Sequence, residues 1–237
     1  AVKRFWDQVT IGTDDAGHAI LLDGRPVHLP GGGKLLVPAR ALAEAIAGEW
    51  QAAGGRKGGE MSFADTPLTR LAGTAQERIA PDPHPTIDAI ARYGESDLLC
   101  YRAESPSELV RRQAAEWQPW LDWVAQRHGA PLRVTAGIAA IRQHHDSIDA
   151  LRATVAGFDP FTLAGLGIAV PALGSLVLGL ALAAGEIDAA RAHALGALDE
   201  LFQEEQWGQD EEAAKRRAAL AEDIALAERM IVLSRPA

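Results

Sequence analysis

The 237-residue sequence contains a single cysteine, Cys100, so it lacks the pair of thiols that an intramolecular disulfide or a dithiol redox site requires. A lone thiol fits a reducing compartment. The chain is 48% hydrophobic and 23% charged, and a globular chain of this length can bury a sizeable core without covalent cross-links.

Positive charge is also scarce, with 23 lysine and arginine residues against 32 aspartate and glutamate residues and a net charge of -9. Proteins that bind nucleic acids need a basic surface that displaces counterions from the phosphates. The composition therefore argues against a nucleic-acid partner, and an acidic surface favours a basic protein partner.

The common motifs of catalysis and cofactor binding are missing. "GGGKLL" and "GGRKGGE" lack the hydroxyl residue and glycine spacing of a Walker motif, and no G-x-G-x-x-G follows an expected strand. "LGSLV" around Ser175 lacks the second glycine of a nucleophile elbow. His144 and His145 in "QHHD" are adjacent and point apart on a helix, so we expect exposed residues at a helix start, with Asp146 as N-cap. We predict no catalytic residue, no cofactor and no metal.

One run between Phe161 and Gly185 has no charged side chain and meets the length of a membrane span, which needs about 20 apolar residues. Pro171 in its middle, and flanks that are acidic without a Lys or Arg bias, argue against membrane insertion. We expect Pro171 to separate a short segment over residues 161–168 from a central helix over residues 173–184, hydrophobic all round because other helices surround it. The side chains expected to be almost fully buried are Leu176, Leu180 and Ala183.

Residues 5–38 alternate short apolar runs with turn sequences such as Asp23-Gly24, a pattern typical of a small antiparallel sheet. The spacing then predicts helices over residues 38–55, from Thr66 as N-cap with Pro67 in the first turn, and over residues 85–94. The apolar run "SDLLCYR" (96–102) is short enough for a strand, and "VTAGI" at residues 134–138 could pair with it.

Beyond about residue 105 the pattern is almost entirely helical. Pro119 should kink or restart the helix over residues 105–129, and two long amphipathic helices over residues 187–207 and 210–233 complete the chain. The predicted fold class is α+β with two domains. Residues 1–104 form a small N-terminal domain with an antiparallel β-sheet plus helices, and residues 105–237 form a larger all-helical C-terminal domain.

A polar cluster lies between the last two helices, where Gly208 interrupts the helical pattern in "EEQWGQDEEAAKRR". Asp210, Glu211 and Glu212 would begin the final helix, where acidic side chains complement the helix dipole. In the alternative explanation, these three carboxylates and an exposed Trp207 form a docking site for arginines of a partner protein. The sequence leaves both explanations open.

Several segments together resemble one known family. "LLDGRPVHLP", "TPLTRLAGTAQERI", "YGESDLLCYRAESPSELVRRQ", "LGSLVLGLALAAG" and "LDELFQEEQWGQDEEA" occur in the order found in the F-type ATP synthase α-subunit assembly chaperone family of alphaproteobacteria and mitochondria. The resemblance covers nearly the whole chain. It implies a non-enzymatic protein, monomeric when free, that binds the unassembled α subunit of the ATP synthase head and shields its interface until the ring forms.

The resemblance also implies a cytoplasmic location in a bacterium, or the mitochondrial matrix in a eukaryote, and gives partner binding to Trp207 and the acids after it. An unassembled subunit exposes an apolar interface that aggregates unless it is covered, so the role is physically reasonable. The alternative is a small hydrolase-type enzyme with a site at the domain junction, where pockets commonly occur.

Overall fold

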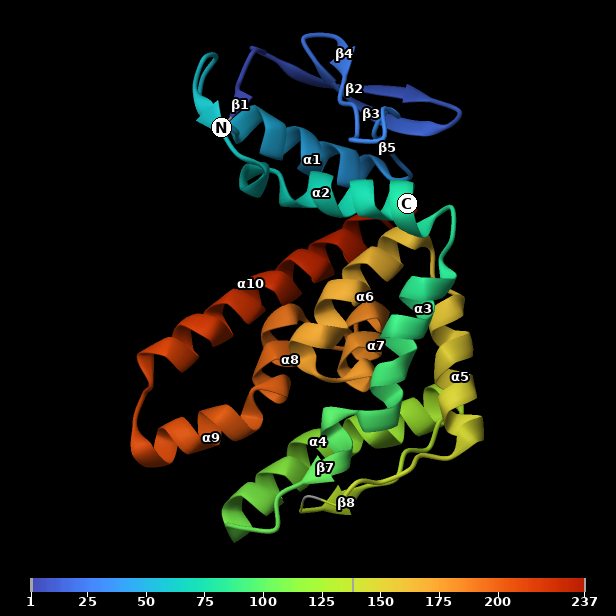
Figure 1. The fold of residues 1–237 in the computed structure, drawn as a ribbon, viewed down its shortest axis with the longest axis vertical. Helices are drawn as coiled ribbons and strands as arrows, with labels where there is room; N and C mark the ends of the chain where they lie inside the picture. The colour runs from blue at the N-terminus through green and yellow to red at the C-terminus, as the bar shows by residue number, and fades with distance from the viewer. Residues whose placement is uncertain (1, 138, 237) are drawn as a thin grey trace. The chain divides into compact units, whose positions relative to one another are not determined.

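The structure is a computed structural model that describes residues 2–137 and 139–236 (Figure 1). It confirms the α+β fold class, with small antiparallel sheets near the N-terminus and mostly helices after them. The strands are β1 (Val2–Lys3), β2 (Val9–Asp14), β3 (Gly17–Leu22), β4 (Arg25–Pro26), β5 (Leu36–Val37), β6 (Glu60–Met61), β7 (Tyr101–Arg102) and β8 (Thr135–Ala136). The α-helices are α1 (Arg40–Ala52), α2 (Pro67–Thr74), α3 (His84–Ala91), α4 (Ser107–His128), α5 (His145–Ala156), α6 (Pro160–Leu173), α7 (Leu176–Ala184), α8 (Ala189–Gly196), α9 (Leu198–Trp207) and α10 (Glu211–Leu233).

Two compact units make up the chain. Unit 1 contains the residues up to 83, residues 159–165 and the residues from 229 onward, whereas unit 2 contains residues 84–158 and 166–228. Compactness does not define an independently folding domain, so the division of the chain at residues 104 and 105 stays a prediction.

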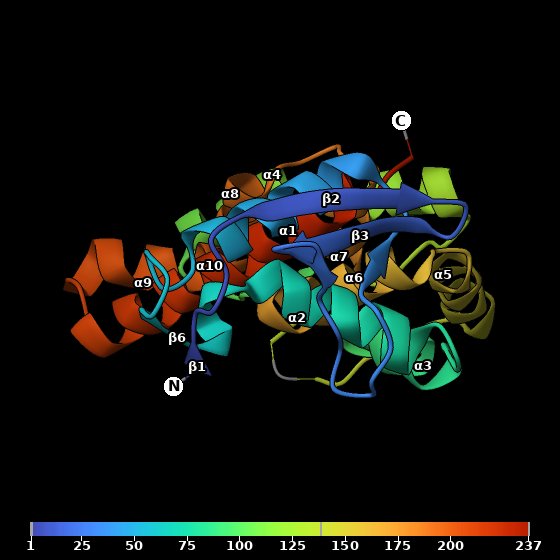
Figure 2. The ribbon, with the colours of Figure 1, turned by 90° about the horizontal axis from the view of Figure 1, so that it is seen from above.

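Unit 1 is built on the expected antiparallel sheet, in which β3 pairs with β2, β4 and β5. The turn between β3 and β4 is Asp23-Gly24, and both residues have positive φ, 46° and 80°, as a two-residue hairpin turn requires. Helix α1 packs against β2 and β3, as Figure 2 shows from above. Its inward residues Leu42 and Ile46 are fully buried, so the sheet and α1 share one apolar core.

The start of α2 is stabilised by a residue from α1. Thr66 is the N-cap, as predicted, but its side chain makes no capping hydrogen bond. The carboxylate of Glu49 instead accepts hydrogen bonds from the backbone N–H groups of Leu68 and Thr69, at 2.9 and 3.3 Å. Burial raises the pKa of Glu49, because it disfavours the charged form, and these two donors partly oppose that shift.

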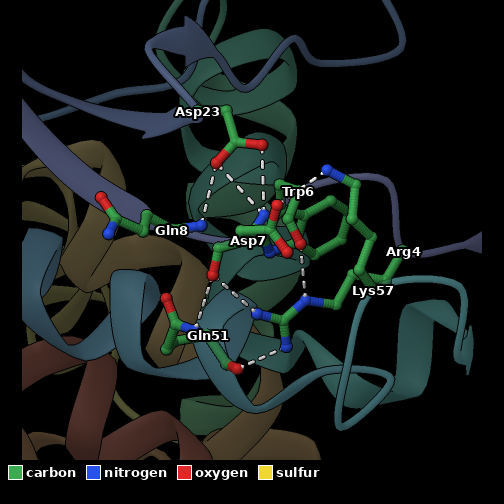
Figure 3. A network of polar contacts seen from close by, with 7 residues as sticks. All are labelled: Arg4, Trp6, Asp7, Gln8, Asp23, Gln51 and Lys57. Atoms are coloured by element: carbon green, nitrogen blue, oxygen red, sulfur yellow. Dashed lines mark hydrogen bonds and ion pairs between the residues drawn. The ribbon is translucent and has the colours of Figure 1, made fainter.

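The N-terminal segment is held by Arg4, whose side chain is almost completely buried. Its guanidinium donates hydrogen bonds only to backbone carbonyls, among them those of Trp6 at 3.0 Å and Gln51 at 2.7 Å (Figure 3). A further bond reaches Ala53 O at 3.2 Å. Since Gln51 and Ala53 lie at the C-terminal end of α1, the cation occupies the negative end of that helix.

Unit 2 has α7 at its centre, in contact with α4 and α8 (Figure 1). Leu176, Leu180 and Ala183 have exposed fractions of 0%, 1% and 7%, which confirms the predicted burial. No helix within the described residues is long and apolar enough to cross a membrane.

The predicted break at Pro171 is wrong, because α6 continues through that residue to Leu173. The chain turns instead at Gly174, which has a φ of +64°, and Ser175 is the N-cap of α7. A proline in the last turn of a helix removes a single backbone bond, whereas the left-handed conformation at Gly174 ends the helix.

Two other expectations in unit 2 hold only in part. The expected pairing of "SDLLCYR" with residues 134–138 is confirmed between β7 and β8, which are parallel. The strand is shorter than expected, because Leu98–Cys100 form a 3-10 turn; Ile138 lies outside the described residues. Helix α4 runs through Pro119 without restarting. Pro119 and Ala115 are both exposed, so the carbonyl of Ala115 that loses its helical partner can bind water.

The helix expected over residues 187–207 is in fact two helices, α8 and α9, joined at Ala197. Ala190 is exposed, whereas Ala192, Leu195 and Phe202 are buried.

Candidate functional site

The turn between α9 and α10 presents the most exposed large aromatic side chain of the described residues. Trp207 ends α9 and its side chain is 80% exposed. Gly208 follows with a φ of +89°, which directs the chain away from the helix axis. Tryptophan is among the side chains that most often dominate binding energy when a partner covers them.

The three acids after Trp207 have different surroundings. Oδ1 of Asp210 accepts a hydrogen bond from the backbone N–H of Ala213 at 2.9 Å, so Asp210 caps α10. Glu211 forms an ion pair with Lys215 at 2.7 Å, four residues later on the same helix. Glu212 is exposed and makes no hydrogen bond or ion pair with another described residue. Capping therefore explains Asp210 and pairing explains Glu211, whereas Glu212, in the first turn of α10, has only the favourable interaction with the helix dipole.

A shallow hollow lies beside this turn. It has a volume of about 350 Å³ and is lined by Glu211, Lys215, Gln209 and the two small residues Ala214 and Ala218. An apolar floor with a charged rim can receive an apolar side chain that lies next to a charged one.

Ion pairs join the two helices on either side of the turn. Arg217 in α10, only 8% exposed, contacts the carboxylates of Glu204 and Glu200 in α9, the latter at 3.5 Å. Arg216 also contacts Glu200, at 3.1 Å. Pairs with a buried arginine are ordered, so the ends of α9 and α10 hold the turn between them in place.

A half-buried carboxylate at the start of α9 was not singled out in the sequence. Oδ1 of Asp199 accepts a hydrogen bond from Nε2 of Gln113 in α4 at 2.7 Å, and burial raises the pKa of Asp199. The amide oxygen of Gln113 accepts from the backbone N–H of Ala103 at 2.8 Å. The two partners are 86 residues apart, and no local pattern could have indicated their contact.

The two side chains that could serve as nucleophiles, Ser175 and Cys100, are both buried in the core. Ser175 is fully buried, and its hydroxyl both caps α7 and donates to Asp97. Cys100 is fully buried, and burial raises the pKa of its thiol to about 12, so the reactive thiolate is suppressed at neutral pH.

The adjacent histidines lie at the start of α5, as expected, but His144, not Asp146, is the N-cap residue of this helix. Within the described part of the chain, no group of three or more metal-binding side chains is assembled.

Comparison with known proteins gives one consistent relationship. A sequence profile of the family described as ATP12 chaperone protein matches residues 3–125. The chain is also 24% identical over 219 residues to the mitochondrial protein atp12 of Schizosaccharomyces pombe, an alignment that covers 89% of this chain and 75% of the relative.

Two crystal structures are similar to this chain in both sequence and fold. Atp12 from Paracoccus denitrificans is 44% identical, with a TM-score of 0.93 and coverage of 98% of each chain. A candidate chaperone from Agrobacterium tumefaciens is 37% identical, with a TM-score of 0.91 and coverage of 98% of this chain and 86% of the other. The chain therefore belongs to the ATP12 chaperone protein family.

Proposed function

We propose that this protein is an assembly chaperone of the F-type ATP synthase that binds the unassembled α subunit of the catalytic head and shields its interface until the ring forms. It acts where that subunit is made or imported, which is the cytoplasm in a bacterium. Membership of a chaperone family supports the general role. The exposed Trp207 between two helices with ordered ends carries the more specific proposal that the α9–α10 turn touches the client.

The contact would combine burial of one aromatic side chain with charge pairing. Trp207 would insert between apolar side chains of the client, because tryptophan is among the residues that most often dominate binding energy. Glu212, which has no partner in the described chain, is the acid best placed to receive an arginine or lysine of the client. Asp210 and Glu211 contribute negative charge while they also stabilise the start of α10.

Binding of the free subunit, and not of the finished ring, is the property that distinguishes an assembly chaperone. The purified protein should co-elute with isolated α subunit in gel filtration at equal stoichiometry, and should not co-elute with the complete α and β ring. Absence of a complex with isolated α subunit would rule out the proposal. Equal binding to the ring would show that the contacted surface stays open after assembly, which contradicts a shielding role.

A further inference from the structure

A small hollow in unit 2 lies between α4 and the helices α8 and α9, and it differs from the hollow beside the α9–α10 turn. It has a volume of about 250 Å³, and its floor is apolar, formed by Ala115, Ala194, Leu198 and Leu201. Pockets that bind small molecules typically measure about 300–1,000 Å³. A hollow below this range has room for a single side chain of a partner protein.

The rim of the hollow carries more negative than positive charge. Its charged side chains are Arg112, Glu116 and Glu205. Glu116 contacts Arg191, which lies outside the hollow. Arg112 contacts Glu108 at 3.0 Å and Glu205 at 2.7 Å, so two carboxylates share one arginine. With these partners counted, three acids face two arginines, and the excess negative charge attracts a cation.

Both carboxylates of the rim keep an oxygen available to a ligand. In Glu116 and in Glu205, Oε2 contacts an arginine of this protein, whereas Oε1 accepts no hydrogen bond from another described residue. The carbonyl of Ala115 is a further acceptor, because Pro119, four residues later in α4, has no N–H to donate to it. Acceptors around an apolar floor match a ligand that carries several donors at the end of an aliphatic stem.

The rim is ordered before a ligand arrives. In addition to its two ion pairs, the guanidinium of Arg112 lies over the ring of Phe202, 5.2 Å from the ring centre. Phe202 is itself buried, so this contact is fixed by the core. Because Arg112 is held at the edge of the hollow, a ligand that enters would immobilise few further side chains, which reduces the entropic cost of binding.

We infer that this hollow receives an arginine side chain of a partner protein. The methylene groups of that arginine would cover Leu198 and Leu201, as the stems of long basic side chains commonly cover apolar surface. Its guanidinium would donate hydrogen bonds to the free oxygens of Glu116 and Glu205 and to the carbonyl of Ala115. Arginine is favoured over lysine because a planar guanidinium presents several donors in fixed directions. Binding of the arginine is independent of whether the α subunit is the client.

NMR titration of the full-length, isotope-labelled protein tests this inference. The probe is a capped tripeptide with arginine between two alanines. Amide signals of α4 and α9 that border the hollow should shift saturably, with a Kd of about 1 mM, as expected for the contact of one side chain. The same peptide with citrulline, an uncharged analogue of similar shape, should bind at least ~10-fold more weakly, because the charge-assisted hydrogen bonds are lost.

Glu205→Gln should weaken binding of the arginine peptide at least ~5-fold, since it removes a charged acceptor. The matched control is Glu108→Gln. Glu108 and Glu205 contact the same arginine, and both side chains are 51% exposed, but Glu108 lies outside the hollow. Ala115→Leu gives a second test without a change of charge, because it places an aliphatic side chain in the hollow and should block the peptide.

Equal losses in the Glu205 and Glu108 variants would show attraction to general surface charge and would overturn the inference. Unchanged binding by the Ala115→Leu variant, or the absence of saturable shifts, would also overturn it. Equal binding of the citrulline peptide would contradict the role of charge, and equal binding of a lysine peptide would contradict the assignment to arginine. The spectrum of each variant shows directly whether its fold is retained.

Discussion

The hydroxyl of Ser175 donates a hydrogen bond to Oδ1 of Asp97 at 2.7 Å, and both residues are fully buried. The same carboxylate accepts backbone N–H groups of Val177 at 2.9 Å and Leu99 at 3.1 Å. One aspartate thus stabilises the start of α7 and the turn at residues 98–100. This contact gives a structural reason for two of the segments that carry the family resemblance, "SDLLCYR" and "LGSLVLG".

The Asp97 carboxyl predicts a pH dependence of stability. Burial raises its pKa to about 6 from a value of 3.8, although hydrogen bonds from Val177, Ser175 and Leu99 favour the charged form. Between these two pH values the folded protein holds a proton that the unfolded chain has lost, so the contribution of Asp97 to stability falls as pH rises through this window. Asp97→Asn removes this titration. The difference in free energy of unfolding between wild type and variant should therefore shrink from pH 4 to pH 7 by at most about 3 kcal/mol.

Urea titrations of both proteins at several pH values measure this difference. A constant difference across the range would mean that Asp97 titrates at the same pH in the folded and unfolded states. Ser175→Ala gives a second check, because it removes both the cap of α7 and a donor to Asp97. It should cost about 1–3 kcal/mol, with the larger cost above pH 6, where Asp97 carries the charge that this hydroxyl stabilises.

Two glycines in unit 2 should respond in opposite directions to alanine. A Cβ atom at Gly179 in α7 would lie 2.5 Å from Cγ2 of Val170, so Gly179→Ala should lower the free energy of unfolding by about 1–3 kcal/mol despite its better helix propensity. Gly167 in α6 is exposed and has nothing within 4 Å of the added atom, so Gly167→Ala should raise stability by up to about 1 kcal/mol. Thermal unfolding of the two variants measures both effects, and equal shifts would contradict the close packing at Gly179.

The buried Arg4 should be essential for the N-terminal segment. Arg4→Met leaves several carbonyl groups at the end of α1 without their donor, and each buried acceptor that loses its donor costs about 1–3 kcal/mol. Lys57→Met is the control, because Lys57 is an exposed cation that pairs with Asp7 in the same region, and its loss should leave stability nearly unchanged. Similar destabilisation by both variants would show that charge in this region, and not the bonds of Arg4, determines the result.

Two substitutions test the proposed binding of the α subunit at the α9–α10 turn. Trp207→Ala should weaken binding of isolated α subunit about 30-fold or more, as for a central aromatic contact, while the fold is unchanged. Glu212→Lys should weaken it about tenfold, because it places a cation against basic groups of the client.

Glu222→Lys is the matched control, with the same charge change on an exposed residue of the same helix that makes no hydrogen bond or ion pair with another described residue. Isothermal titration calorimetry gives the three affinities. If Glu212→Lys and Glu222→Lys behave alike, net charge governs binding and the turn is not the contact. If Trp207→Ala also binds normally, the client uses another surface.

Sequence patterns predicted the elements that depend on local chemistry. The turn at Asp23-Gly24 and the burial of Leu176 follow from residue type and spacing alone. The sequence could not show contacts between distant residues, such as the bond from the N–H of Leu68 to Glu49, 19 residues earlier. It also could not show that α6 continues past Pro171 and ends at Gly174, whose left-handed conformation stops the helix. Sequence patterns also could not distinguish the three acids after Trp207. The structure shows that Glu212 alone among them makes no hydrogen bond or ion pair with another described residue.

The complete burial of Cys100 makes this thiol a chemical reporter of core motion. It is the one cysteine in the sequence, so any alkylation of the protein by a thiol reagent reports on a single position. Because the folded core excludes the reagent, the labelling rate measures how often that part of unit 2 opens. Comparing the labelling rate of Cys100 with and without bound α subunit would show whether binding reduces the frequency of opening in the core of unit 2.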